Sequence, residues 1–207
     1  PRKVIKLARK MGITSYLPAV PSLCLGTAEI SLFEMTGAYS TFANSGIYME
    51  PYFVSRIEDK NGVVIETFTN SPKEILSEDK NIVMVKLLQG VINRGSGSRL
   101  RWKYKMNNEI AGKTGTTQNH SDGWFIGFVP DLVTGVWTGA DNRAVRFRDL
   151  KLGQGAQMAL PIWGEYMNSL YSDSLIELNK ARFEIPKNSN NITLDCSDKT
   201  QIENEEF

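Results

Sequence analysis

The sequence is poor in cysteine and histidine. Its 207 residues include two cysteines, Cys24 and Cys196, and a single histidine, His120. Two cysteines cannot build a disulfide framework, and their spacing matches no metal-binding motif. One disulfide between them and two free thiols both stay open. The composition therefore excludes disulfide-rich scaffolds and gives no sign of a metal site.

Long apolar runs and an excess of one charge are also missing. No stretch reaches the about 18 apolar residues of a membrane-spanning helix, and the opening PRKVIKLARKMGI is amphipathic rather than a signal peptide. Twenty-four basic and 23 acidic residues leave a net charge of +1. Such a balance creates no strong field for nucleic acid or anionic membranes, so we expect no nucleic-acid partner.

The order of the expected elements predicts an α+β fold with an antiparallel sheet and packed helices. Apolar spacing and caps predict helices at about 1–11, 31–44, 77–95 and 161–171, separated by loops at 15–26 and 96–109. Asn61-Gly62 predicts a tight turn with positive φ in a hairpin at 52–68. A meander is expected at 110–117, 124–129 and 132–138. Strand-helix-strand alternation is absent, which argues against a doubly wound fold.

Residues 112–117 read G-K-T-G-T-T and carry the chemistry of the chain. Their glycines leave room for an extended peptide to lie along the strand edge. Lys113 offers a cation there, and the hydroxyls of Thr114, Thr116 and Thr117 can donate to a carboxylate. A backbone N–H on such an edge can also face a developing oxyanion. The segment therefore suits acyl transfer at a peptide C-terminus.

The triplet K-T-G alone is not specific, because a glycine-bracketed lysine also occurs at the ends of surface strands. Strict alternation along a strand moreover places Lys113 and Thr116 on opposite faces. Twist or edge geometry would have to bring both side chains to one site.

Two long blocks give the triplet a context. Residues 111–142 resemble a block of the class A penicillin-binding proteins, in which G-K-T-G-T-T is followed by D-x-W-F-x-G-x-x-P and V-W-x-G. Residues 21–51 resemble the preceding block, with its P-S-x-x-L-G, E-M-x-x-A-Y and F-A-N-x-G. The resemblance covers about residues 1–170. It implies the C-terminal half of a transpeptidase domain with the penicillin-binding protein and serine β-lactamase fold.

The resemblance also implies roles for the strand. Lys113 would be catalytic, taking part in proton relay and binding the substrate carboxylate. Thr116 would bind that carboxylate and lend its N–H to the oxyanion hole, while Thr114, Gly115 and Thr117 would contact substrate along the edge. In the family Lys113 and Thr116 share one cleft, against the alternation argument. No metal or organic cofactor is implied.

The family uses three motifs in order: S-x-x-K with the nucleophile, then S-x-N, then K-T-G. Only the third is in place, and a serine nucleophile needs its adjacent base. Ser77 and Lys80 match S-x-x-K as a string, but Ser77 is predicted to be a helix N-cap. The string at 189–191 matches S-x-N but follows K-T-G. We therefore expect both motifs upstream of Pro1, in the missing N-terminal half of the domain.

The expected domain is residues 1–180, followed by a polar, weakly ordered tail at 181–207. Without its N-terminal half, the domain would expose the face that packs on that half, which predicts poor solubility.

Several other polar and aromatic residues are expected to be structural. His120 is interpreted as a polar loop neighbour and Asp122 as a cap between loop and strand. The basic side chains at 94, 99, 101, 103 and 105 are interpreted as a solvated loop. Trp124, Phe125 and Trp137 are interpreted as core residues at strand spacing.

The resemblance predicts a D,D-transpeptidase: a serine is acylated by a D-Ala-D-Ala stem peptide, and the acyl group passes to a neighbouring amine. β-Lactams would acylate the same serine. The parent would carry a glycosyltransferase domain and a membrane helix, and would face outward from a bacterial inner membrane. The alternatives are a D,D-carboxypeptidase or β-lactamase relative, and a non-catalytic peptide-binding module. A fragment that does not fold alone is a third.

Overall fold

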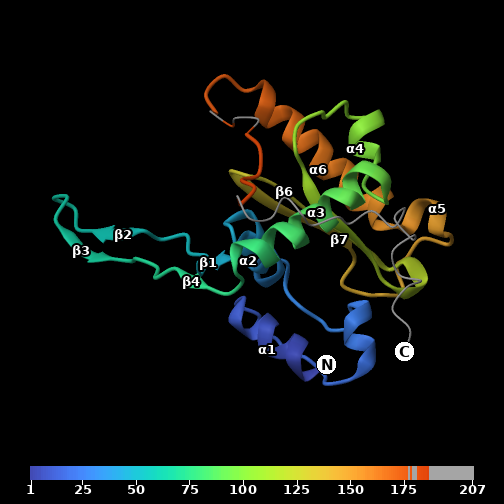
Figure 1. The fold of residues 1–207 in the computed structure, drawn as a ribbon, viewed down its shortest axis with the longest axis horizontal. Helices are drawn as coiled ribbons and strands as arrows, with labels where there is room; N and C mark the ends of the chain where they lie inside the picture. Colours follow the sequence, from blue (N-terminus) through green and yellow to red (C-terminus); the bar gives the residue numbers. More distant parts are fainter. Residues whose placement is uncertain (177, 179–180, 187–207) are drawn as a thin grey trace, which may run out of the picture.

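The computed structural model describes residues 1–176, 178 and 181–186, and its centre is a three-stranded antiparallel sheet (Figure 1). The strands are β5 (Ala111–Thr116), β6 (Asp122–Val129) and β7 (Leu132–Gly139), in the order β5-β6-β7. Each strand is joined to the next by a short connection, so neighbours in sequence are neighbours in the sheet. The predicted meander is confirmed.

Helices cover both faces of this sheet. On one face lies α6 (Gly155–Ser172), where the buried rings of Phe125 and Trp163 meet edge to face at 5.3 Å. On the other lie α2 (Leu32–Ala43) and α3 (Glu78–Arg94), which pack around the buried Phe128. Apolar side chains of β6 alternate between these two layers, as a doubly covered strand requires. The α+β prediction is confirmed.

The N-terminal segment packs against α2. It contains α1 (Arg2–Lys10) and a short 3-10 helix, η1 (Pro21–Leu25), inside the stretch predicted as irregular loop. Gly12 follows α1 with φ +86°, and a Cβ there would lie 2.0 Å from the Tyr48 hydroxyl. Glycine is thus required both by the backbone angle and by the close approach.

A long β-hairpin extends away from the body of the protein (Figure 1). It is built from β2 (Arg56–Glu58) and β3 (Val64–Thr67), with β1 (Ile47–Tyr48) pairing β4 (Lys73–Glu74) at its base. The predicted hairpin is confirmed, and Gly62 has the positive φ, +81°, expected of its turn. The Gly62 N–H donates to the Asp59 carbonyl oxygen at 3.1 Å, and the Asp59 carboxylate accepts from the N–H groups of Asn61 and Val63 and so organises the turn.

Two further helices were not expected. A single turn, α4 (Arg99–Trp102), lies in the predicted loop after α3, and α5 (Leu150–Gly153) precedes α6. The predicted closing helix began at Pro161, whereas α6 begins at Gly155 and carries that proline inside. Proline is common in the first turn of a helix, which is why the predicted start at Pro161 lies too far along the chain. No helix in the described part of the chain has the length and apolar content of a membrane span.

Three large apolar residues of the closing helix, Ile162, Tyr166 and Met167, do not form one buried face. Only Met167 is buried; the other two are about half exposed. The buried face instead combines Met167 with Trp163 and Leu160, which point toward the sheet.

The chain beyond α6 returns to the body at residues 181–186. Phe183 is buried against Phe128, with ring centroids 5.5 Å apart, and its N–H donates to the Glu109 carboxylate at 2.8 Å. The start of the predicted tail is thus packed on the domain. The rest of that prediction, at 187–207, lies outside the described residues, and the boundary at 180 stays a prediction.

Candidate active site

The K-T-G strand β5 lies at an edge of the sheet. Among the described residues its only strand partner is β6, with Lys113 opposite Ile126 and Thr116 opposite Gly123. The start of the strand is buried, whereas Lys113 and Thr116 are exposed. The outer edge of β5 is therefore available for an extended chain to pair with.

Lys113 and Thr114 make contacts along this edge. The Lys113 Nζ donates to the Thr114 carbonyl oxygen at 2.7 Å. The hydroxyls of Thr114 and Ser96 are 2.6 Å apart. Ser96 follows α3, so this contact ties the K-T-G strand to the end of that helix. No pattern in the sequence marks Ser96, which lies in the stretch predicted as a loop at 96–109.

Thr116 contacts the first turn of α6. Its Oγ1 accepts a hydrogen bond from the Gly155 N–H at 3.0 Å, which satisfies one of the free donors at the start of the helix. A Cβ on Gly155 would lie 2.2 Å from the Gly115 carbonyl oxygen and 2.5 Å from that of Trp124. Only glycine lets the helix approach the strands this closely.

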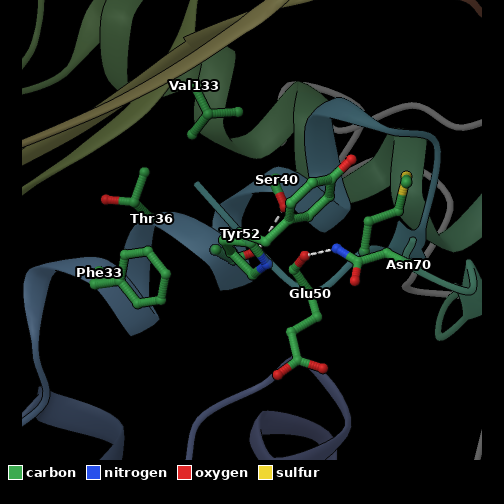
Figure 2. A pocket seen from close by; sticks show the side chains of 10 residues that line it. Phe33, Thr36, Ser40, Glu50, Tyr52, Asn70 and Val133 are labelled. Atoms are coloured by element: carbon green, nitrogen blue, oxygen red, sulfur yellow. Dashed lines mark hydrogen bonds between the residues drawn. The ribbon is translucent and has the colours of Figure 1, made fainter. Parts of the chain in front are cut away.

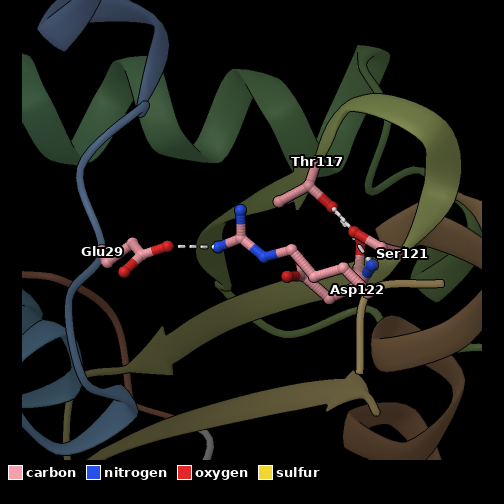
Figure 3. Close-up of polar contacts among 5 residues, drawn as sticks. Glu29, Thr117, Ser121 and Asp122 are labelled. Atoms are coloured by element: carbon pink, nitrogen blue, oxygen red, sulfur yellow. Dashed lines mark hydrogen bonds and ion pairs between the residues drawn. The ribbon is translucent and has the colours of Figure 1, made fainter. Parts of the chain in front are cut away.

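Thr117 holds the turn that follows β5 (Figure 3). Its Oγ1 accepts from the Asp122 N–H at 3.1 Å and lies 3.0 Å from the Ser121 hydroxyl. The predicted cap is reversed: Thr117 caps the start of β6 with its side chain, whereas Asp122 uses its backbone. Nearby, an exposed ion pair of 2.6 Å joins Glu29 to Arg143 and links the segment before α2 to the loop after β7.

The strand keeps its alternation through the motif. Lys113 shares a face with Ala111, which packs in the α3 layer, and Thr116 shares a face with Thr114, on the α6 side. Their side chains therefore leave opposite faces of β5, and the strand edge is what they have in common. The two ion pairs of the described residues do not involve Lys113.

The other predicted residues occupy structural positions. Ser77 is the N-cap residue of α3, although its side chain makes no capping hydrogen bond. His120 lies in η2 (Gln118–His120), with φ +58°, in the turn after the motif. Arg101 corrects the expectation of a solvated loop, because it donates to the carbonyl oxygens of Met106 and Asn108. The string at 189–191 lies outside the described residues.

The predicted core aromatics divide into two groups. Phe125 is fully buried, as expected, while Trp124 is half-buried and Trp137 is 39% exposed. The prediction that all three are core residues is therefore wrong for Trp137, which lies near the C-terminal end of β7.

Two cavities in the described part of the chain lie away from the K-T-G strand. The larger, about 360 Å³, is at the root of the hairpin, where Phe33, Thr36, Tyr52 and Val133 line an open apolar space (Figure 2). The smaller, about 260 Å³, adjoins the first turn of α3. Neither is lined by residues 112–117, where Lys113 and Thr116 are exposed on the strand edge.

Comparisons with known proteins agree with this geometry. The family model of the penicillin-binding protein transpeptidase domain matches residues 16–143. Penicillin-binding protein 1A of Aquifex aeolicus is 37% identical over 164 residues, which cover 79% of this chain and 22% of that protein. Penicillin-binding protein 2D of Bacillus subtilis is 34% identical, and the match covers 93% of this chain and 27% of that protein. The chain thus spans about a quarter of these relatives.

A solved structure shares the fold. Penicillin-binding protein 1A from Haemophilus influenzae superposes with a TM-score of 0.74 at 22% identity, covering 86% of this chain and 31% of the other. The family model alone covers more than half of the sequence, including the K-T-G strand. This chain belongs to the penicillin-binding protein transpeptidase domain family.

Proposed function

We propose that this chain is the C-terminal part of a serine D,D-transpeptidase domain, spanning residues 1–180, and that β5 binds the end of a peptidoglycan stem peptide. The observation that carries the proposal is the exposed edge of β5, with Lys113 and Thr116 on it. A D-Ala-D-Ala peptide can pair with that edge as an added strand. Gly115 keeps the path of the peptide free of a side chain.

Two donors on this edge suit the carboxylate that ends the stem peptide. The Lys113 ammonium has three N–H groups, of which one is directed at the Thr114 carbonyl. The Thr116 hydroxyl accepts from Gly155, so its own proton is free to be donated. In this proposal the Thr116 N–H also faces the oxyanion, and Thr117 supports the edge by holding its turn.

The reaction proceeds through an acyl-serine in this proposal. The hydroxyl of a serine outside this chain attacks the carbonyl of the penultimate D-alanine, and the terminal D-alanine leaves. An amine of a neighbouring stem peptide then displaces the serine. Lys113 assists proton transfer beside that serine, whose partner lysine lies in the N-terminal half of the domain.

β-Lactams are expected to acylate the same serine. The M. tuberculosis relative PonA1 has been solved in complex with penicillin V, and it matches this chain at a TM-score of 0.68 and 23% identity. We further propose that the parent is outward-facing and membrane-anchored, and that it also extends glycan strands. A similar structure from Eggerthella lenta is named as a D,D-transpeptidase domain of a peptidoglycan glycosyltransferase, with a TM-score of 0.54.

Fluorescent penicillin tests the proposal on the full-length protein. We expect covalent labelling that survives denaturation and falls at least tenfold in Lys113→Ala. Lys60→Ala, which removes another exposed lysine, at the hairpin tip, is the matched control and should label normally. Absence of labelling in the folded wild-type protein would favour the non-catalytic peptide-binding module.

A second assay separates the enzymatic alternatives. Incubation with a pentapeptide donor and an amine acceptor should yield the cross-linked product. Release of D-alanine without cross-linking identifies a carboxypeptidase, and fast hydrolysis of penicillin identifies a β-lactamase.

A further inference from the structure

The smaller cavity, about 260 Å³, is a second candidate site. It lies where the first turn of α3, the turn after α2 and the returning segment 184–186 meet. The Ser96 loop beside the K-T-G strand follows the other end of α3. Because α3 has 17 residues, about 25 Å of helix separates its two ends. The cavity is therefore distinct from the proposed active site.

Asn81 is the feature that points to a ligand. The residue is 5% exposed and lines the cavity. Its Nδ2 donates to the Phe42 carbonyl oxygen at 2.9 Å, which fixes the orientation of the amide. Its Oδ1 is buried and has no hydrogen-bond partner among the described residues. A buried acceptor without a donor costs free energy, so a donor in the cavity would be stabilising.

The rest of the described lining is rich in oxygen acceptors. Glu78 and Glu184 contribute carboxylates and Ser45 contributes a hydroxyl, and no lysine, arginine or histidine among the described residues lines the cavity. Neither carboxylate takes part in an ion pair within the described residues. The ligand should therefore be positively charged and should donate hydrogen bonds.

A primary ammonium group matches the acceptors of this lining. Its three N–H groups equal the number of strong acceptors, namely the Asn81 amide oxygen and the carboxylates of Glu78 and Glu184. We propose that this cavity binds the primary ammonium group of a small amine.

Isothermal titration of the full-length protein with n-butylammonium tests the proposal at constant ionic strength. We expect saturable binding, with tetramethylammonium binding at least tenfold more weakly because it has the same charge and no N–H. Equal binding of the two cations, or no saturable binding, overturns the proposal; the second result means that water alone satisfies Asn81.

Variants assign the binding to this cavity. Glu78→Gln should weaken butylammonium binding about tenfold, since it removes one charge-assisted hydrogen bond. Asp79→Asn is the matched control: it removes a carboxylate from the same helical turn, but Asp79 does not line the cavity. If both variants weaken butylammonium binding equally, the carboxylates act only through their long-range electrostatic field, and the site is rejected. Asn81→Leu should abolish binding, with circular dichroism confirming that the variant folds.

Discussion

The Thr116 hydroxyl of the K-T-G strand accepts a hydrogen bond from the backbone N–H of Gly155, at the first turn of α6. These residues are 39 positions apart, and the contact orients a side chain on the exposed strand edge. Because the Thr116 oxygen accepts this bond, the hydroxyl proton is available to be donated to a ligand. The N-terminus of α6 carries a partial positive charge and lies beside Thr116, so it favours an anionic ligand there.

Thr116→Val should lower the rate of acylation by fluorescent penicillin in the full-length protein. The change removes a hydroxyl donor and leaves the Gly155 N–H without its acceptor, so we expect a fall of about tenfold to a hundredfold. Thr116→Ser keeps the hydroxyl and should retain most of the rate. If Val and Ser variants acylate alike while both stay folded, Thr116 does not bind the substrate carboxylate.

Gly155→Ala should destabilise the protein. The added Cβ would lie 2.2 Å from the Gly115 carbonyl oxygen, so helix and strand must separate, at a cost of roughly 2 kcal/mol or more. Gly90→Ala is the matched control in a helix, because nothing lies within 4 Å of its added Cβ. That variant should gain about 0.5 kcal/mol. Urea unfolding measures both, and equal changes would mean that the close approach is not required.

The local elements of this fold could be predicted from the sequence. Ser31 and Glu34, three positions apart at the start of α2, form a capping box with both reciprocal hydrogen bonds present. The meander and its Pro130-Asp131 turn follow from short-range patterns as well. These features depend on residues within a few positions of each other, so sequence spacing carries them.

The contacts that build the candidate site could not be predicted in this way. Thr114 meets Ser96, and Thr116 meets Gly155, through packing of α3 and α6 that no local pattern specifies. The expected roles of Lys113 and Thr116 depend on the family resemblance, whereas strand alternation alone predicts that their side chains leave opposite faces of the strand. The position of Phe183 is equally non-local, since its partner Glu109 lies 74 residues away.

Glu34→Gln should lower stability at neutral pH and much less at acid pH. Burial tends to raise the pKa of the Glu34 carboxyl, but hydrogen bonds from Ser15 and Thr14 outweigh it and hold the pKa well below its usual range. The folded state therefore prefers the ionised form. This contribution is present above the unfolded pKa, about 4.3, and is lost as pH falls below it.

Urea unfolding at pH 7 and pH 3 measures this effect. We expect Glu34→Gln to cost about 2 kcal/mol at pH 7, because several charge-assisted hydrogen bonds are lost, and less at pH 3. Glu66→Gln on the exposed hairpin is the control and should change little at either pH. A loss that is the same at both pH values would show that the charge of Glu34 is unimportant.

Phe183→Ala should destabilise the domain although it lies near the end of the described chain. The ring is 8% exposed and packs edge to face on Phe128, so truncation leaves a cavity beside the sheet and costs about 3 kcal/mol. Ile185→Ala, at a residue that is 56% exposed, should cost less than about 0.5 kcal/mol. Chemical denaturation compares the two. Equal and small losses would mean that the segment after α6 adds nothing to the core, and that the domain ends with that helix.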